Sequence, residues 1–581
     1  MPAMSFGLVL LVLSSIAGCG EAQPAPNHNG LAEATAPCDH AGDAPATQVA
    51  FPAAQGFGRF ARGGRGGAVF QVTSLDDSGP GTLRDCAEAS GPRTCIFRVS
   101  GTIALDDWIK VKHPFLTIAG QTSPGGIALR IRNATDSPML VQTHDVVIRY
   151  LRLRPGPSAI RSTNVDTIQV SGGAHDVILD HLSTSWPTDE GINIVGPGHG
   201  PAPCGPTRNV TVQWSILSEG LNVANREAHS RGTYFGYGAE NVSFIHNLIA
   251  SNMRRNPLIN TRGQFDMINN VIYNSGAYNG EFYTRFGDLK VNVIGNAAIA
   301  GPSSRKNTQL YLVNYFRDYP ADFSIYLSGN LDLHRRTDSG DQRLVLEPSD
   351  WKYVSSSPVG QLSVPASAIT GPSEAYRAIA VASGATRPRR DAVDRRVIGE
   401  MLACRGAIIN DPAEVGGWPD LSGPAAPPDR DQDGMPDTWE VKHGLSPTNP
   451  ADRNGTGQAS YTNLESYLNE LAGDGTDMAM ADLPVVTPDP TCGFAIAAAP
   501  PLPSVSLTVS PASIVSGGSA ELRWSGSDLL ACKVEGEGPT PFGSMVVSPK
   551  VTTAYQVSCI GRGGGDAIDS VLLRVTPRAA S

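Results

Sequence analysis

The sequence lacks several features that would place it in common classes of protein. Its 45 Lys and Arg against 55 Asp and Glu give a net charge of −10 without a basic stripe, which argues against a nucleic-acid partner. No CxxC spacing indicates zinc or redox chemistry. Helix formers are sparse, whereas 63 Gly and 45 Pro are many. The composition therefore favours a turn-rich β protein.

The start of the chain also lacks something: its first 19 residues hold no Lys or Arg, which a signal peptide normally carries. The apolar stretch from Phe6 to Ile16 is shorter than the roughly 20 residues that cross a bilayer. Small residues before Cys19 resemble a bacterial lipobox, so we expect 1–19 to be a lipoprotein signal peptide and Cys19 to be lipidated. Ordinary secretion and a wrongly assigned start are the alternatives. The protein is expected outside the cell or on the outer membrane, held there only by its lipid.

Without Cys19, the nine cysteines leave an even eight, which predicts disulfides in an oxidising compartment. Cys86–Cys95 and Cys532–Cys559 are plausible local pairs. The sequence does not pair the remaining four, which are Cys38, Cys204, Cys404 and Cys492.

One short phrase recurs through the middle of the chain, as in DVILDHLST, NVTVQWSIL and NVSFIHNLI. The first strong apolar residues of the seven copies are Val147, Val177, Val210, Val242, Phe265, Val291 and Ile325. They are separated by 23 residues at the closest (Val242 to Phe265) and by 34 at the widest (Val291 to Ile325). Apolar and polar residues alternate within each phrase, as in a strand with one inward face. Such spacing indicates a stacked repeat, and we predict an all-β, right-handed parallel β-helix.

Four phrases carry an asparagine five residues after the marker: Asn247, Asn270, Asn296 and Asn330. Asparagines stacked at one turn can hydrogen-bond to the backbone and to each other along the column.

Changes of composition divide the chain into successive parts. We expect residues 20–47 to form a flexible tether and residues 48–418 to form the β-helix. Prolines then interrupt the chain before a small module over 429–475, and 476–504 form a linker. Residues 505–577 alternate in short strands around Trp524 and two cysteines, which predicts an immunoglobulin-like β-sandwich serving as a spacer, an adaptor or a carbohydrate binder.

The segment DRDQDGMPDTWE matches an EF-hand-type calcium loop, also similar to thrombospondin type 3 repeats. It offers oxygen ligands from Asp429, Asp431, Asp433, Asp437 and Glu440, with Gly434 at the sharp turn. We expect bound Ca²⁺ to stabilise the fold of this module. We do not expect the module to act as a calcium sensor. Asp452, Asn454 and Glu465 could form a partner site, although their spacing does not fit the same loop.

Several segments in fixed order resemble the bacterial pectate lyases of polysaccharide lyase family one. They include GFGRFARGGRGG, VTSLDDSGPGTLRDC, LTIAGQTSPGGIALRI, VILDHLSTSWPTDEGINI and RRNPLI. The resemblance implies β-elimination of polygalacturonate or pectin, with Ca²⁺ bridging an acidic polysaccharide and an acidic protein. A monomer is expected.

The resemblance also implies ligands for that calcium. Asp166 matches an aspartate of the family, while Asn164 and Asn193 stand where acidic residues are usual. Asp189 fits a first ligand and Asn193 a second, and Glu190 replaces Asp189 if the register slips by one. Two asparagines in place of aspartates predict weaker calcium binding than in typical members.

The base of the family is the first arginine of R-x-P-x-x-R, here Arg255, whereas the second arginine is Asn260. Arg254 or Arg262 could hold the substrate carboxylate instead, and His229 could contact substrate. Because an arginine pKa is about 12.5, Arg255 acts as a base only where neighbours or an alkaline medium favour its neutral form; otherwise it is an electrophilic clamp.

Two rival functions remain open at this point. One is a β-helix hydrolase of the polygalacturonase type, which the asparagines argue against; the other is a non-catalytic surface binder of polysaccharide, which they favour. Asp180 and His181 suggest a dyad, but no serine elbow accompanies them, so a framework role is preferred.

Overall fold

The computed structural model describes residues 47–132, 137–157, 165–224, 227–305, 312–314, 321–474, 488–492, 504–527, 529–534, 537–561 and 566–577. Within these ranges, no helix has both the length and the apolar character that crossing a membrane requires.

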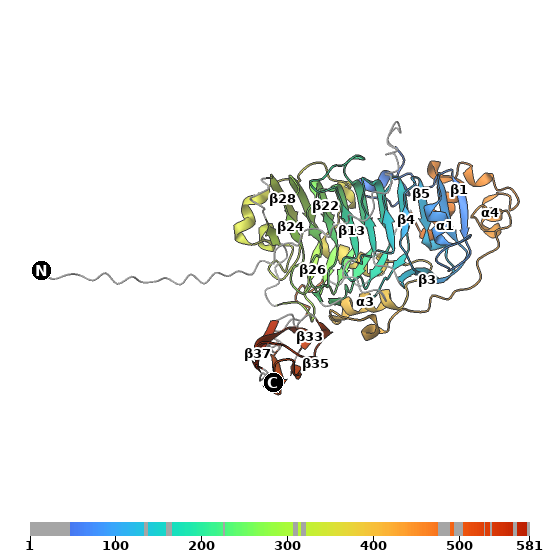
Figure 1. Cartoon of the computed structure of the whole chain (residues 1–581). Helices are drawn as coiled ribbons and strands as arrows, with labels where there is room; N and C mark the ends of the chain where they lie inside the picture. Colours follow the sequence, from blue (N-terminus) through green and yellow to red (C-terminus); the bar gives the residue numbers. More distant parts are fainter. Residues whose placement is uncertain are drawn as a thin grey trace. The chain divides into compact units, whose positions relative to one another are not determined.

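Three parallel sheets stack into a coil in the described part of the chain (Figure 1). The long sheet contains β1 (Ala68–Val72), β2 (Arg93–Phe97), β5 (Leu116–Ala119), β8 (Val146–Arg149), β11 (His175–Asp180), β14 (Arg208–Gln213), β19 (Glu240–Ile245), β22 (Arg262–Ile268), β25 (Leu289–Ile294), β28 (Phe323–Ser328) and β29 (Val354–Ser355). The β13 sheet contains β4 (Ile109–Val111), β7 (Met139–Val141), β10 (Ile168–Val170), β13 (Ile192–Val195), β18 (Tyr234–Gly236), β21 (Leu258–Ile259), β24 (Glu281–Tyr283) and β27 (Leu312–Asn314). The β15 sheet contains β3 (Gly101–Leu105), β6 (Ile127–Ile131), β9 (Arg152–Leu153), β12 (Ser183–Ser185), β15 (Ile216–Ser218), β20 (Leu248–Ala250), β23 (Val271–Tyr273) and β26 (Ala297–Ile299). The predicted all-β class and parallel β-helix are confirmed.

The seven recurring phrases form seven consecutive strands of the long sheet, from β8 to β28. Inward residues of neighbouring strands pair directly, as Val177 does with Val210 and Val210 with Val242. The first marker was wrong by one residue, because Val177 pairs with Val146 and not with Val147. Side chains alternate along a strand, so this slip assigns Val147 to the wrong face.

The asparagine column is confirmed. The side-chain amide of Asn247 donates to the side chain of Asn270 (3.1 Å), Asn270 to Asn296 (3.0 Å) and Asn296 to Asn330 (3.0 Å). Each of the first three also accepts a backbone N–H from the rung before it, as Asn270 does from Asn247 (2.9 Å). The buried turns of the coil are therefore fully hydrogen-bonded at this column.

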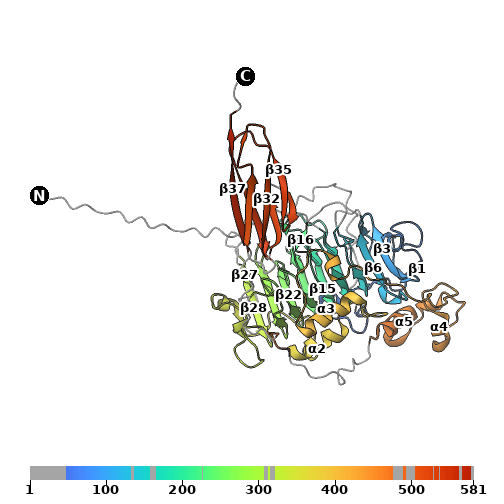
Figure 2. The same cartoon turned by 90° about the horizontal axis from the view of Figure 1, so that it is seen from below.

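The strands of the coil stop at Ser355, well before Trp418, where we predicted its end. The following segment forms α2 (Pro372–Ala382) and α3 (Ala392–Ala403), which lie along the β15 sheet (Figure 2). Buried arginines fasten α3: Arg154 pairs with Asp391 and with Asp394 (3.0 Å). The remaining short elements of the coil region are α1 (Leu83–Glu88), the antiparallel pair β16 (Val223–Ala224) and β17 (Glu227–Ala228), and single 3-10 turns over Phe57–Phe60, Gly120–Thr122, Gln342–Val345, Pro348–Tyr353, Ala366–Ala368 and Pro412–Val415.

The small module contains α4 (Asp437–His443) and α5 (Asn463–Ala472), separated by 3-10 turns at Asp452–Asn454 and Gln458–Ser460. Its apolar side chains Met435, Leu464 and Leu468 pack into one buried cluster with Ile96 and Ala119 of the coil. The module thus shares a hydrophobic core with the first rungs.

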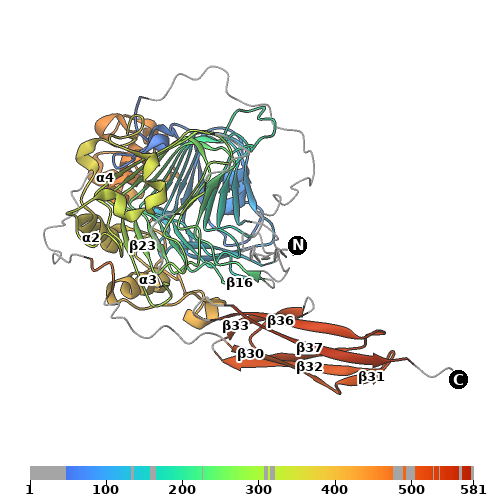
Figure 3. The ribbon, with the colours of Figure 1, turned by 90° about the vertical axis from the view of Figure 1, so that its left-hand side faces the viewer.

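The C-terminal strands form two sheets, which are red in Figure 3. One contains β30 (Ser504–Ser510), β32 (Ala520–Ser527) and β35 (Gly543–Val547); the other contains β31 (Ser513–Val515), β33 (Leu529–Val534), β34 (Glu537–Thr540), β36 (Thr553–Gly561) and β37 (Asp566–Thr576). Trp524 and Leu522 lie in the core of this sandwich.

Disulfides join Cys86 to Cys95 and Cys532 to Cys559, as predicted. A third joins Cys404 to Cys492, a pair that the sequence left open. Cys532 and Cys559 lie on neighbouring strands of one sheet, whereas the disulfide of an antibody domain bridges two sheets. The disulfide therefore differs from that of an antibody domain, and the immunoglobulin-like assignment stays a prediction.

Candidate functional site

Three carboxylates gather at the start of two neighbouring strands of the β13 sheet. Oxygens of Asp166, Asp189 and Glu190 lie within 4.8 Å of one another. Asp166 and Glu190 are buried, and Asp189 is partly exposed. Such a set of oxygen donors fits a hard divalent cation.

The strand register explains why these side chains meet. Ile168 of β10 pairs with Ile192 of β13, and Ile192 and Ile194 both point into the core, as predicted. Asp166 and Glu190 each stand two residues before the paired isoleucines, so they occupy equivalent places on successive rungs. The backbone N–H of Glu190 donates to Asp166 (3.0 Å) and locks this arrangement. Asp189 and Glu190, which the sequence offered as alternatives, both belong to the group.

Two arginines from the next rungs neutralise part of this charge. Arg231 lies 2.8 Å from a carboxylate oxygen of Asp189 and 3.8 Å from one of Glu190. Arg255 forms an ion pair with Glu190. The three carboxylates and two guanidiniums leave one net negative charge at the edge of the sheet.

Glycine lets these rungs approach closely. A Cβ atom on Gly232 would lie 2.4 Å from the carbonyl oxygen of Arg255, closer than any side chain tolerates. The backbone N–H of Gly191 donates to the carbonyl of Gly232 at 2.6 Å. Because Gly191 and Gly232 lie side by side, Glu190 and Arg231 before them are also neighbours.

Asn193 completes the group in an unusual way. Its amide nitrogen donates to Asp166 (2.9 Å), while its carbonyl oxygen is buried and has no hydrogen-bond partner among the described residues. A buried oxygen left without a partner is costly, and a cation held by the neighbouring carboxylates would satisfy it. The residues present therefore fit a calcium ion. Asn164 lies outside the described residues.

The other predicted contact residues are tied to the protein itself. His229 is buried, 2.7 Å from the carbonyl of Thr188, instead of exposed on a loop. Arg254 pairs with Glu281 (2.7 Å) and Arg262 with Glu240 (2.5 Å). The side chains of the two arginines are close to half exposed.

Asn260 is also engaged, because its amide donates to the hydroxyl of Tyr234 (3.3 Å) and its carbonyl accepts the N–H of Arg285 (3.2 Å). Burial raises the pKa of Tyr234, whose ring centroid lies 5.4 Å from the guanidinium of Arg255. The tyrosine therefore stays protonated and neutral beside the charged group.

Asp180 and His181 belong to the framework. Asp180 is fully buried between His181 (2.9 Å) and Arg149 (2.7 Å), and these two neighbours hold its pKa well below the usual range despite burial. The ring of His181 stacks between Tyr150 (4.7 Å) and Trp214 (6.1 Å) in a column of side chains at one turn. This environment supports the framework role expected from the sequence.

Similar proteins identify the family of the chain. A probable pectate lyase C from Aspergillus flavus is 35% identical over 433 residues, covering 73% of this chain and 94% of that protein. The chain belongs to the pectate lyase family. A probable pectate lyase C from Aspergillus terreus is 34% identical over the same length, covering 73% and 94%, and one from Emericella nidulans is 34% identical over 438 residues, covering 74% and 94%.

These pectate lyase relatives are fungal, and the expected bacterial kinship stays a prediction. No family model matches the chain. Among solved structures, jun a 1, the major allergen from cedar pollen, is 18% identical and has a TM-score of 0.42, covering 57% of this chain and 92% of that one. The fold assignment rests on the strand pairing of this chain itself.

Within this pectate lyase framework, sequence reasoning missed Arg231. The segments DEGIN and HSRGTY could have revealed it, because aligning their glycines sets Arg231 beside Glu190. That alignment needs the rung-to-rung register, which the recurring phrases define for the long sheet and not for the β13 sheet.

Proposed function

We propose that this chain is a pectate lyase that cleaves polygalacturonate or pectin by calcium-assisted β-elimination. The observation that carries the proposal is the meeting of Asp166, Asp189 and Glu190 with Arg231 and Arg255 at one sheet edge. Family membership supports the same reaction, since the relatives are named as probable pectate lyases.

The chemistry requires a proton to leave C5 of a uronate, which places further negative charge on the adjacent carboxyl group. The bond from C4 to the glycosidic oxygen then breaks, leaving a C4–C5 double bond. Calcium bound by Asp166, Asp189, Glu190 and Asn193 would supply positive charge to that carboxyl group, a contribution of several kcal/mol. A dication also changes the net charge of the group from −1 to +1, which suits an anionic substrate.

Arg255 is the residue proposed to take the C5 proton. Its guanidinium is engaged in an ion pair with Glu190, so a role at C5 requires that carboxylate to be engaged elsewhere. Asp166, Asp189 and Glu190 turned toward a common cation would release Arg255 toward substrate. Arg231, which is partly exposed, is placed to pair with a substrate carboxylate, while Arg254 and Arg262 at the exposed surface are candidates for more distant sugars.

Two rival functions fit the same fold less well. A hydrolase needs a carboxyl group free to donate a proton to the leaving group, whereas Asp189 and Glu190 are each engaged in an ion pair with an arginine. A non-catalytic binder would need no base, and Arg255 beside the carboxylates favours the enzyme.

Incubation of the whole protein with polygalacturonate separates the three functions. Ultraviolet absorbance of an unsaturated uronate that disappears with chelator supports the lyase. New reducing ends without absorbance would support a hydrolase, and binding without either product would support a binder. A parallel sample with methylated pectin tests the preference between the two substrates.

The location of the enzyme is a separate proposal. Family membership agrees with an enzyme that meets plant polysaccharide outside the cell. The lipid at Cys19 stays a prediction, because Cys19 lies outside the described residues. Mass spectrometry of the N-terminal peptide from native membranes would detect a diacylated Cys19 or its absence.

A further inference from the structure

The small module holds a second set of acidic side chains, independent of the lyase site. Oxygens of Asp429, Asp431 and Asp433 lie within 4.8 Å of one another, and so do those of Asp433, Glu440 and Asp452. Asp433 belongs to both groups, so five carboxylates surround one place. Gly434, with a φ of +97°, makes the sharp turn between the loop and α4.

Several oxygens of this set are buried without hydrogen-bond partners. Both side-chain oxygens of Asp431 and Glu440, and one each of Asp433 and Asp452, have no hydrogen-bond partner among the described residues. Asp433 and Glu440 are fully buried. Burial and the neighbouring acidic groups raise the pKa of Asp433 and of Glu440 to about 7. Several unpaired acidic oxygens aimed at one point leave an electrostatic cost that a cation removes.

The ligand set differs from the one that the sequence pattern offers. Asp437, the expected ninth-position ligand, belongs to neither group; its carboxylate accepts the backbone N–H of Arg430 (2.8 Å) and pairs with that side chain (3.3 Å). Asp452 lies in its place, twelve residues after Glu440. Glu465 does not join it in these groups, since Glu465 caps α5 and is bonded to Arg65.

We propose that Asp429, Asp431, Asp433, Glu440 and Asp452 bind one calcium ion that fastens the module to the first rungs of the coil. Hard oxygen donors in this number suit Ca²⁺, whereas Mg²⁺ demands a tighter octahedron and keeps several waters. The ion acts on stability and takes no part in the elimination reaction.

The loop touches the coil directly. The side-chain amide of Gln71 on β1 donates to Asp429 (2.7 Å). A Cβ atom on Gly434 would lie 3.1 Å from Ile96 and 3.2 Å from Val69, so the turn packs closely on β1 and β2. An ion that orders the loop therefore also orders its contacts with the open end of the β-helix.

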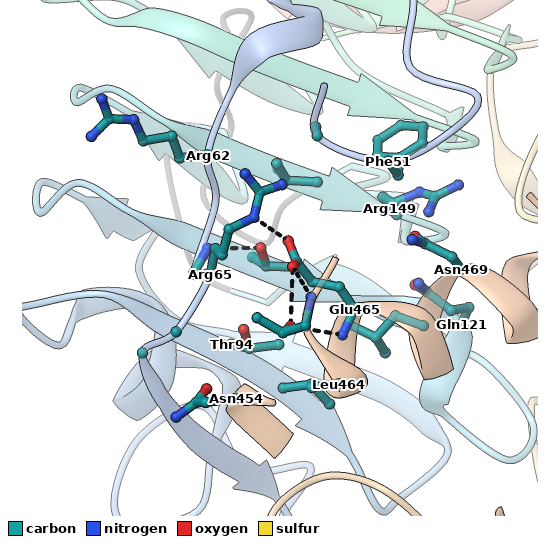
Figure 4. A pocket seen from close by; sticks show the side chains of 18 residues that line it. Phe51, Arg62, Arg65, Thr94, Gln121, Arg149, Asn454, Leu464, Glu465 and Asn469 are labelled. Atoms are coloured by element: carbon teal, nitrogen blue, oxygen red, sulfur yellow. Dashed lines mark hydrogen bonds and ion pairs between the residues drawn. The ribbon is translucent and has the colours of Figure 1, made fainter. Parts of the chain in front are cut away.

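Further ion pairs lie along the boundary between the coil and the module, which we call the seam. Arg149 of β8 is bonded to Asp474 at the end of the module (2.7 Å), and Arg65 to Glu465 (2.7 Å). Figure 4 shows Arg65 and Glu465 pointing toward each other across the seam. The cavity lined by Arg65, Arg149 and Glu465 measures about 30 Å³, room for little more than water.

The test uses the whole chain, stripped of metal with chelator and then titrated with CaCl₂ alone. We expect calcium to raise the midpoint of thermal unfolding and magnesium at the same concentration to raise it less. Glu440→Gln keeps the size of the side chain but removes one charge, so calcium binding should weaken about tenfold or more. In chelator the same variant should be at least as stable as the wild type, because a repelling charge has gone.

Two controls make the result decisive. Glu470→Gln changes an exposed acid of α5 that pairs with Lys442 outside the cluster, and it should keep the full calcium shift. Asp166→Asn should lose lyase activity while keeping the shift, which separates this proposal from the proposed function. The proposal is overturned if millimolar calcium leaves the unfolding of the wild type unchanged, or if Glu440→Gln retains the wild-type shift.

Discussion

The two acidic groups of this protein are built for cations in different ways. In the coil, Asp189 and Glu190 are already paired with Arg231 and Arg255. In the module, the five clustered carboxylates have no ion pair with a basic side chain in the described part of the chain, and several of their oxygens have no hydrogen-bond partner. Clustered carboxylates alone therefore do not determine the role of a proposed metal site.

The arginines make the coil group stable without a cation. A cation there would have to compete with guanidiniums, so we expect weak binding until an anionic substrate occupies them. We expect the empty module group to be unstable and its calcium binding to be tight and independent of substrate. Such a division suits a site that must exchange metal and polymer together and a second site that must hold the fold.

The largest effect is expected from removing the proposed base. Arg255→Lys should lower kcat/KM about 10³-fold, because a positioned acid–base group contributes about 10²–10⁴-fold. Arg343→Lys, which changes an exposed arginine paired with Asp341 away from the proposed site, is the matched control and should stay near wild type. Product absorbance at 0.1 mM calcium and at saturating calcium would measure both. If Arg255→Lys were as active as the control, the base would have to be sought elsewhere.

A variant of Arg231 should remove the difference between the coil group and the module group. Arg231→Gln removes the positive charge beside Asp189, so the coil group should come to resemble the module group. We expect about tenfold tighter calcium binding without substrate, a modest share of the several kcal/mol that a close charge pair can contribute. Calorimetry on a Glu440→Gln background, in which calcium binding by the module is weakened, would measure the coil site. Unchanged affinity would show that Arg231 does not compete with the metal.

The same variant should bind calcium better and turn over substrate worse. Arg231 is the partly exposed guanidinium proposed to pair with a substrate carboxylate, so kcat/KM should fall with a raised KM. Arg254→Gln serves as a control for the effect on calcium binding, because Arg254 pairs with Glu281 at the same edge but touches none of the three carboxylates.

A smaller effect should follow from restoring an acid in the coil. Asn193→Asp replaces the amide that now donates to Asp166 and sets two carboxylates about 3 Å apart. In chelator this should cost about 1 kcal/mol of unfolding free energy, a cost typical of removing one hydrogen bond. In calcium the variant should recover that stability and bind the ion several times more tightly. Equal stability of the variant and wild type in chelator would contradict the observed geometry.

The sequence predicted the parts of the molecule that depend on neighbouring residues. Alternation over six residues revealed seven strands of the long sheet, from β8 to β28, and the asparagine column followed from one residue recurring after four of them. It also led to Asp166, Asp189 and Asn193, because those positions match a family pattern. What it missed depends on segments far apart: Cys404 pairs with Cys492 across 88 residues.

Arg231 escaped detection for the same reason. Its neighbour Glu190 stands 41 residues away, and only the register of β13 and β18 brings them together. The end of the coil was also misjudged, since the helices α2 and α3 bury their apolar faces against the outside of the coil. Their periodic apolar residues were not separated from those of further strands.

The smallest effect tests the point at which pattern and geometry disagree. The EF-hand pattern makes Asp437 a calcium ligand, whereas its carboxylate faces Arg430 at the start of α4. Asp437→Asn should keep the hydrogen bond to the backbone of Arg430 and lose the ion pair with the exposed Arg430 side chain and an interaction with the helix dipole, each worth about 0.3–1 kcal/mol. Calcium should then shift the unfolding midpoint of this variant as far as that of the wild type. If the shift vanished instead, the loop would bind its ion as the local pattern prescribes, and Asp452 would be a bystander brought close by the fold.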